Sequence, residues 1–255
     1  MTRSKAIARK VLFFCRPSIP VHFNEPVHYA VKFRSAIPRY LIGCLPAWFA
    51  RPFMTVRVSE RIVEIPFVFS NLRVPKGSVV VDVGCVESRL SLELANLGYK
   101  VLAVDIRPYE FCHPNLKVIR GDFVQSPIDD RSVDAVVAVS TLEHLGLPCY
   151  SMQGSPGSDL SAMEKIRRIL RPGGQLILTV PYGQEGQTEW FRVYGHGALQ
   201  RLLEGFAVDK LEFYERIGLD AWKEIREENA RGISSDGETN CVALVSAFVA
   251  KRQNG

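Results

Sequence analysis

The sequence predicts a doubly wound α/β protein, with a mostly parallel sheet of seven strands, helices on both faces and a basic N-terminal extension. Three observations support this class. From about residue 74, short apolar runs alternate with helical patterns. The runs are apolar throughout, as in strands buried on both faces. Glycine-containing loops follow several of them. Strands that alternate with helices pair in parallel.

The first half of this region predicts four strands and one helix. The run SVVVDV at 78–83 is a buried strand that ends at Gly84. Leucines at helical spacing predict a helix over 87–97, which stops at Gly98. The next three strands are expected at 100–105, 116–120 and 133–140.

The second half predicts two helices and three strands. Residues 159–170 form a helix with Asp159 as N-cap, which Pro172-Gly173-Gly174 ends. A strand at 175–180 and a helix at 197–203 follow. The last two strands, at 207–214 and 241–250, are separated by a polar stretch without a strong helical pattern, 220–238. This leaves room for a final strand inserted antiparallel.

Charge is unevenly distributed over the 255 residues. The net charge is +5, but residues 1–59 carry ten basic residues and one acid, and residues 60–255 carry 22 basic and 26 acidic residues. Enzymes that act on nucleic acids usually carry basic charge around the site itself, so we expect no nucleic-acid partner. The apolar share of 47% is typical of a globular protein. We expect an extension or cap over 1–70 and the main domain over 71–255.

The six cysteines and the apolar runs bear on localisation. The cysteines lie at 15, 44, 85, 112, 149 and 241, without a C-x-x-C pair, which favours a reducing, cytoplasmic compartment. The longest apolar run, 41–50, contains a proline and is about half of what a membrane span needs. The N-terminus has no convincing cleavage site for a signal peptide.

Polar and glycine residues follow the predicted strands, at the edge where open α/β sheets bind ligands. These segments are D-V-G-C-V-E-S at 82–88, Asp105, G-D-F at 121–123 and S-T-L-E-H-L-G at 140–146. A glycine after a buried strand lets the backbone approach a ligand closely. An acid about 20 residues beyond it can accept hydrogen bonds from both hydroxyls of a ribose.

The ordered set of motifs resembles the class I S-adenosylmethionine-dependent methyltransferases, which have a Rossmann-like fold. The resemblance covers roughly residues 74–250 and rests on VVVDVGC, VLAVD, GDF, VDAVVAVSTLEHLG and ILRPGGQLILTVP. It implies S-adenosylmethionine as the cofactor. A dehydrogenase is disfavoured, because GCVESR at 84–89 lacks the two later glycines of a dinucleotide-binding loop.

The resemblance also implies a role for each matching position. Asp105 would bind the ribose hydroxyls and Ile106 would pack on the adenine. Asp122 would accept from the adenine amino group, and the backbone amide of Phe123 would face the ring. The methionine part would be bordered by Asp82, Gly84, Cys85, Ser88, Ser140 and Thr141.

One position departs from the family pattern. Val86 stands where the family usually has a second glycine, and its Cβ narrows the approach to the cofactor. Two classes of function therefore stay open: an active methyltransferase, and a non-catalytic member that uses the fold as a binding module.

His144 and Glu143 are the candidate catalytic residues. They follow the fourth strand, where the acceptor should meet the methyl group, and a hydroxyl acceptor needs a general base. The alternative is that Glu143 starts a helical turn and His144 caps or packs. The spacing of His, Asp and Glu residues predicts no required metal.

Candidate substrate residues lie in two glycine-rich loops: Asp159, Tyr182, Arg192, Tyr194 and His196. Aromatic faces with acids suit a carbohydrate, and an arginine suits a carboxylate or phosphate; a solvated loop is the alternative. The runs RIVEIPFVFSNL and STLEHLGLPCY resemble bacterial methyltransferases of sugars and cell-surface glycans. We expect O-methylation of a sugar or glycan, with a small-molecule natural product as the alternative.

Residues 1–59 combine basic and aromatic side chains, including Trp48, Phe49 and Phe53. This composition suits a peripheral contact with a membrane, or an anionic, lipid-linked acceptor. A cap over the substrate cleft or an arm of a homodimer is the alternative.

Overall fold

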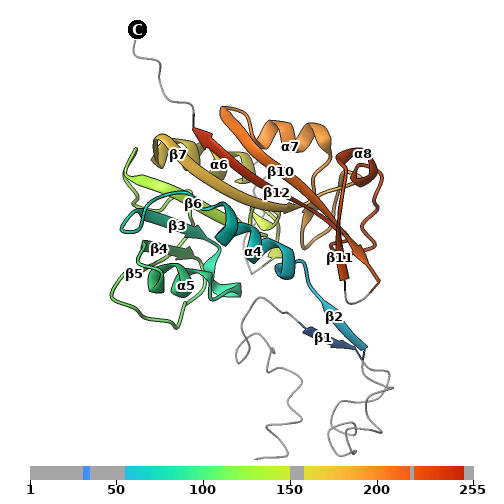
Figure 1. Cartoon of the computed structure of the whole chain (residues 1–255), viewed down its shortest axis with the longest axis horizontal. Helices are drawn as coiled ribbons and strands as arrows, with labels where there is room; N and C mark the ends of the chain where they lie inside the picture. The colour runs from blue at the N-terminus through green and yellow to red at the C-terminus, as the bar shows by residue number, and fades with distance from the viewer. Residues whose placement is uncertain (1–30, 35–54, 150–157, 219–220, 250–255) are drawn as a thin grey trace, which may run out of the picture.

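The computed structural model describes residues 31–34, 55–149, 158–218 and 221–249. One sheet dominates it, with the strand order β11-β10-β12-β7-β6-β3-β4-β5 (Figure 1). Its strands are β3 (Val79–Val83), β4 (Lys100–Asp105), β5 (Leu116–Arg120), β6 (Val133–Val139), β7 (Leu170–Pro181), β10 (Phe206–Ile217), β11 (Ala221–Ile225) and β12 (Cys241–Val249).

The predicted mostly parallel α/β sheet is confirmed. Strands β5, β4, β3, β6 and β7 pair in parallel, and β12 lies antiparallel between β7 and β10. The chain runs outward from β3 to β4 and β5, then returns to the other side of β3 as β6. This reversal places a crevice at the carboxyl ends of β3 and β6, where such sheets bind ligands.

Alternate residues of the strands enter two separate cores. On one face, Val80 packs with residues of α4 (Arg61–Asn71) and α5 (Leu90–Asn96). On the other face, Val81 packs with α6 (Ser158–Ile169) and α7 (His196–Leu202). The central strands are therefore buried on both sides, which explains their uninterrupted apolar sequences.

The helix after β3 differs from the expected 87–97. A 3₁₀ turn, η3 (Cys85–Glu87), precedes the shorter helix α5. Ser88 interrupts the two because its backbone is extended, with φ −145° and ψ 163°, and its Oγ accepts a hydrogen bond from the Leu90 amide at 3.1 Å. A serine before a helix commonly satisfies the amides of the first turn in this way.

The polar stretch 220–238 contains an eighth strand of the sheet and the short helix α8 (Glu227–Ala230). Strand β11 forms a hairpin with β10 at the sheet edge. Trp222 on this strand lies beneath the Arg216 guanidinium, 5.2 Å from the ring centroid, and its indole N–H donates to the carbonyl of Val58 at 3.1 Å. An exposed edge strand lacks a long apolar run, which is why the sequence pattern did not predict it.

Helix α4 packs on the sheet although its sequence contains Pro66. The proline is exposed, whereas Ile65, Phe67 and Val68 are buried in the core beside β3 and β6. Before it, β1 (Val31–Arg34) and β2 (Thr55–Val58) form an antiparallel pair. Residues 1–30 and 35–54 lie outside the described residues, and the domain boundary at 70 stays a prediction. No helix in the described ranges has the length and apolar character needed to span a membrane.

Candidate functional site

Gly84 and Thr141 close the gap between the ends of β3 and β6. Gly84 adopts the left-handed conformation, with φ +76°. The Thr141 hydroxyl lies within hydrogen-bond distance of the carbonyls of Val83, at 2.9 Å, and Val139, at 3.0 Å, and so bridges the two strands. A Cβ on Gly84 would stand 2.4 Å from Thr141 Oγ1. The predicted pair therefore forms a tightly packed floor at the crevice.

Asp105 ends β4 as predicted, and both of its carboxylate oxygens already accept hydrogen bonds. Oδ1 accepts from the amide and Nε of Arg107, at 2.9 and 3.2 Å. Oδ2 accepts from the amide of Val86 at 3.1 Å and from Arg107 Nη2 at 3.3 Å. A carboxylate offers about four lone-pair sites. Ribose hydroxyls can bind the Asp105 carboxylate only if the Arg107 guanidinium moves away from it.

Asp82 and Cys85 are buried beneath the loop after β3. Asp82 Oδ2 accepts from the Ser91 hydroxyl at 2.6 Å. Burial raises the pKa of the Asp82 carboxyl to about 6, against the smaller effect of the Ser91 hydrogen bond. Burial also raises the pKa of the Cys85 thiol, so this cysteine stays protonated. Ser88 Oγ is engaged by the Leu90 amide and contributes to the local helix start.

The residues predicted to face the adenine follow β4 and β5. Ile106 is half-buried beside Asp105, and its carbonyl accepts from Arg120 Nε at 3.3 Å. Asp122 is exposed, with Oδ1 accepting from the Val124 amide at 2.9 Å, whereas Phe123 is buried in the core. The turn Gly121–Phe123 thus presents the Asp122 carboxylate outward and anchors itself through Phe123. Their roles toward the cofactor stay predictions.

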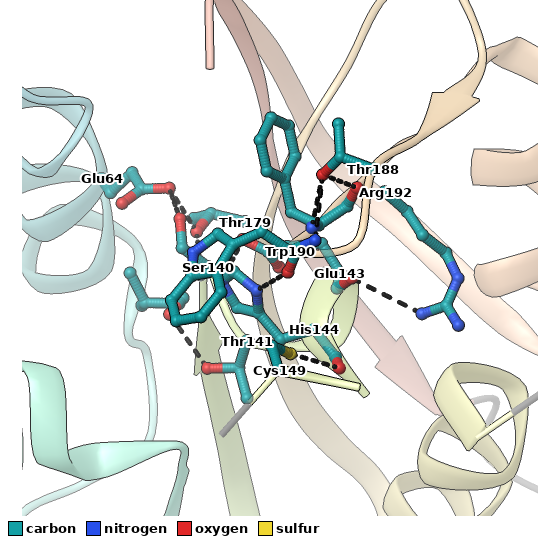
Figure 2. A network of polar contacts seen from close by, with 12 residues as sticks. Glu64, Ser140, Thr141, Glu143, His144, Cys149, Thr179, Thr188, Trp190 and Arg192 are labelled. Atoms are coloured by element: carbon teal, nitrogen blue, oxygen red, sulfur yellow. Dashed lines mark hydrogen bonds and ion pairs between the residues drawn. The ribbon is translucent and has the colours of Figure 1, made fainter. Parts of the chain in front are cut away.

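A buried network that the sequence analysis did not predict joins α4 to the ends of β6 and β7 (Figure 2). Glu64, with no exposed surface, accepts from the hydroxyls of Ser140 at 2.6 Å and Thr179 at 2.7 Å. Its other oxygen accepts from Arg61 Nη1 at 3.0 Å. Burial raises the pKa of the Glu64 carboxyl, while the nearby Arg61 charge opposes that rise.

Glu143 and His144 lie in the 3₁₀ turn η4 (Leu142–His144), directly after β6 (Figure 2). Glu143 is 2% exposed, and its Oε2 is buried without a hydrogen-bond partner. Burial raises the pKa of its carboxyl well above the usual range. A buried acid with a raised pKa beside a predicted site is typical of functional positions.

His144 is oriented by the loop that follows β7. Its Nδ1 lies 2.6 Å from the carbonyl oxygen of Trp190, and the two rings meet edge to face. A carbonyl only accepts, so this contact fixes the proton on Nδ1 and leaves the lone pair of the neutral ring on Nε2. Nε2 lies 3.8 Å from Glu143 Oε1. The geometry therefore favours His144 as the proton acceptor, with Glu143 beside it.

Three of the five predicted substrate residues line one pocket of about 400 Å³. The pocket lies among the start of α6, the strand pair β8 (Gly186–Gln187) and β9 (Arg192–Val193), and α7. Its polar lining includes Asp159, Glu185, Gln187, Arg192, Tyr194 and Arg201.

Two contacts within that pocket connect it to the rest of the site. Asp159, the second residue of α6 rather than its N-cap, accepts from the Tyr194 hydroxyl at 3.0 Å. Arg192 donates to the carbonyl of Leu145 at 2.6 Å and points toward η4 (Figure 2). The guanidinium thereby ties the pocket wall to the turn that carries Glu143 and His144.

Tyr182 and His196 belong to a different cluster. The Tyr182 hydroxyl donates to Glu227 Oε1 at 2.7 Å, and His196 Nδ1 contacts the same oxygen. Arg231 Nη2 also donates to it, at 3.1 Å. Burial favours the neutral form of Glu227, but these hydrogen bonds outweigh it and lower the pKa of the carboxyl. The cluster joins α8 to the start of α7, and neither predicted residue lines the pocket.

The described residues contain no group of three His, Cys, Asp or Glu side chains arranged to hold a metal ion. They do fit the cofactor implied by the sequence motifs. Asp105 would hold the ribose after the Arg107 guanidinium moves away. The floor formed by Gly84 and Thr141 would border the methionine part, where a side chain at position 84 has no room. The cofactor would supply an electrophilic methyl group at this edge of the sheet.

Comparison with known proteins agrees with this geometry. A family model described as a methyltransferase domain matches residues 81–178. The chain is 30% identical to a sterol 24-C-methyltransferase of Gibberella zeae, over 41% of this chain and 28% of that protein. It is 28% identical to a sterol 4-C-methyltransferase of Caenorhabditis elegans, over 62% and 47%. The match thus spans about a quarter to a half of these two relatives.

Other relatives are covered more fully. A ubiquinone biosynthesis O-methyltransferase of Xanthomonas campestris is 26% identical over 68% of this chain and 71% of that protein. Among solved structures, a methyltransferase of Methanosarcina mazei aligns with a TM-score of 0.53 at 17% identity, covering 73% of this chain and 98% of that one. The [4+2]-cyclase SpnF aligns with 0.55 at 14%, covering 74% and 80%.

The fold, the ordered motifs and the matched model agree. Residues 81–178 match a methyltransferase domain, and the sheet of the described residues has the fold of solved S-adenosylmethionine-dependent methyltransferases. The relatives cited above are methyltransferases of sterols and of ubiquinone biosynthesis, and none of them is named for a sugar acceptor.

Proposed function

We propose that the protein transfers the methyl group of S-adenosylmethionine to a hydroxyl group of a sugar or glycan-type acceptor. The observation that carries this proposal is the His144 ring, whose Nδ1 faces the Trp190 carbonyl and whose Nε2 is therefore the basic nitrogen. Methyl transfer to a hydroxyl needs a group that takes its proton, whereas transfer to an already basic nitrogen with a free lone pair does not.

The residues of this chain perform three tasks in the proposed reaction. The pocket beside α6 holds the acceptor, and its acids and arginines offer hydrogen bonds to several hydroxyls. His144 accepts the proton of the attacking hydroxyl at Nε2. Burial of Glu143 disfavours a negative charge beside the attacking oxygen, because it raises the pKa of that carboxyl. Most of the rate enhancement then comes from alignment and the exclusion of water.

The polar lining of the pocket supports a hydroxylated acceptor over a sterol. A sterol nucleus presents a broad apolar surface, and burying charged groups against it without partners is costly. Asp159 and Arg192 line the pocket, the first receiving the Tyr194 hydroxyl and the second held by Leu145. A small-molecule natural product with several hydroxyls shares this chemistry and is the alternative acceptor.

The proposal predicts a specific effect of His144→Ala. We expect kcat to fall by about 10²–10⁴-fold, the usual contribution of a general base, while the dissociation constant of S-adenosylhomocysteine changes by less than about threefold. Methyl transfer to a panel of monosaccharides, lipid-linked glycans and polyhydroxylated natural products identifies the acceptor, and calorimetry measures cofactor affinity. Unchanged kcat would remove His144 from this role.

One observation favours a second candidate, a non-catalytic binding module. Arg107 and the Val86 amide together occupy the lone pairs of Asp105. Calorimetric titration separates the two functions: a methyltransferase binds S-adenosylmethionine and S-adenosylhomocysteine, and absence of binding for both at millimolar ligand would leave only the module.

For location we propose the cytoplasm, with peripheral contact at a membrane through residues 1–59. The support is the excess of basic and aromatic residues in that segment and the cysteine pattern.

A further inference from the structure

Ser140 occupies a backbone conformation that serine seldom adopts. It follows β6 directly, and its φ is +44°, in the left-handed region that glycine tolerates and residues with a Cβ avoid. From this residue the chain turns into Thr141 and then into η4, which carries Glu143 and His144. The dihedral angles of Ser140 therefore set the direction of the predicted catalytic turn.

Two sets of contacts hold Ser140 in this conformation. Its hydroxyl donates to Glu64 Oε1 at 2.6 Å. Its amide faces Thr179, at 2.9 Å from Oγ1 and 3.2 Å from the carbonyl. The Thr179 hydroxyl in turn donates to the same oxygen of Glu64, at 2.7 Å. Both contacts thus converge on Glu64, which lies 76 residues earlier in the chain.

Glu64 is itself held in place by charge. Arg61, one helical turn before it, donates from Nη1 to Glu64 Oε2 at 3.0 Å and to the carbonyl of Val139 at 3.1 Å. The Glu64 side chain has no exposed surface, and that of Arg61 is 12% exposed. A strained residue persists only where its surroundings over-determine it, and strain of this kind clusters at functional sites.

We propose that Glu64 is a positioning residue, which holds Ser140 in the left-handed conformation and so directs η4 and His144 at the acceptor. This rests on the proposed methyl transfer. Glu64 contacts Ser140, which precedes η4, so it affects the reaction only by setting the position of His144.

Two substitutions of Ser140 separate conformation from hydroxyl chemistry. Ser140→Ala and Ser140→Gly both remove the hydroxyl, but only glycine adopts a positive φ without a Cβ penalty. We expect kcat of Ser140→Gly to exceed that of Ser140→Ala by about tenfold or more. Equal losses would mean that the hydroxyl itself matters, and would overturn the proposal.

A double-mutant cycle tests the link to Glu64. Glu64→Gln keeps the size of the side chain but places an amide donor against the donors of Arg61 or Ser140. We expect kcat to fall about tenfold or more in the wild-type background and less than about threefold in the Ser140→Gly background. Glycine adopts a positive φ without the hydrogen bond to Glu64 that holds Ser140. Glu164→Gln, an exposed substitution on α6, is the matched control. An equal loss in both backgrounds contradicts the proposal.

Amide hydrogen exchange gives a readout that does not depend on an acceptor. The amides of His144 and Leu147 donate within the turn, to Thr141 and His144 carbonyls at 3.1 and 3.2 Å. Glu64→Gln should speed their exchange about tenfold and leave β6 unchanged. If methyl transfer is absent but exchange increases, the proposed function fails and the positioning by Glu64 stands. If exchange in the turn is unchanged, the positioning fails.

Discussion

Buried carboxyls near the carboxyl edge of the sheet, among them Glu64, Asp82 and Glu143, differ in their hydrogen-bond partners. Glu64 is surrounded by donors, including a guanidinium, whereas Glu143 keeps one oxygen without a partner. Asp82 has a single hydroxyl donor to its side chain. Burial raises the pKa of the Glu143 carboxyl, and its unpaired oxygen makes the charged form costly.

Asp82 should make stability depend on pH. Its folded pKa of about 6 lies above the ordinary value of 3.8, so its stabilising contribution is complete below pH 3.8 and is lost as the pH rises through 6. Asp82→Asn does not titrate. Relative to this variant, we expect the wild type to lose up to about 3 kcal/mol of unfolding free energy between pH 4 and 7. Denaturant unfolding of both proteins across that range measures it, and a constant difference contradicts it.

At the scale of elements, strands buried on both faces were predictable because their sequences are continuous apolar runs. The bounds of β4 and β5 agree with the expected ranges. Helix α4 was not predicted as a helix, since Pro66 and two charged residues interrupt its pattern. Strand β11 was missed because it is an exposed edge. The sequence did not predict the roles of Arg61 and Glu64. Residues far along the chain cover most of both side chains, so their neighbours in sequence carry no pattern that indicates burial.

The loop after β3 offers a test with a matched control. Gly84 and Gly77 both have positive φ, at +76° and +88°. A Cβ at Gly84 would lie 2.4 Å from Thr141 Oγ1, whereas a Cβ at Gly77 would meet nothing within 4 Å. We expect Gly77→Ala to cost about 1–2 kcal/mol and Gly84→Ala about 2–4 kcal/mol, because only the second adds overpacking to backbone strain.

Chemical denaturation provides the comparison, and Thr141→Ser should recover part of the Gly84→Ala loss by removing a methyl group. Equal costs for the two alanine variants would show that Thr141 moves aside freely.

At the scale of the whole molecule, charge divides the chain into two parts. Residues 60–255 carry a net charge of −4 and contain the predicted cofactor-binding edge, while residues 1–59 carry +9. The Trp222 indole on β11 donates to the carbonyl of Val58, so the end of the basic segment is fastened to the sheet edge opposite β5. The eighth strand thus provides an attachment point for the N-terminal region.

Removing residues 1–59 tests the membrane contact proposed for them. Vesicles that contain anionic lipid should bind the full chain and lose most of that binding on the deletion, with stronger binding at low than at high salt because the attraction is screened. Sedimentation with vesicles of neutral lipid is the control. Equal binding by the full and shortened chains would favour a cap over the cleft or a dimer arm.

The position of β12 has a consequence for synthesis of the chain. It is the last strand of the sheet in sequence order, yet it lies between β7 and β10. On the ribosome, β7 must wait with one edge unpaired until residues 241–249 emerge, although its neighbour β6 is complete far earlier. A nascent or prematurely terminated chain therefore exposes an apolar strand edge that can pair with other chains. This topology therefore makes folding of the nascent chain depend on chaperones that cover the unpaired edge of β7 during translation.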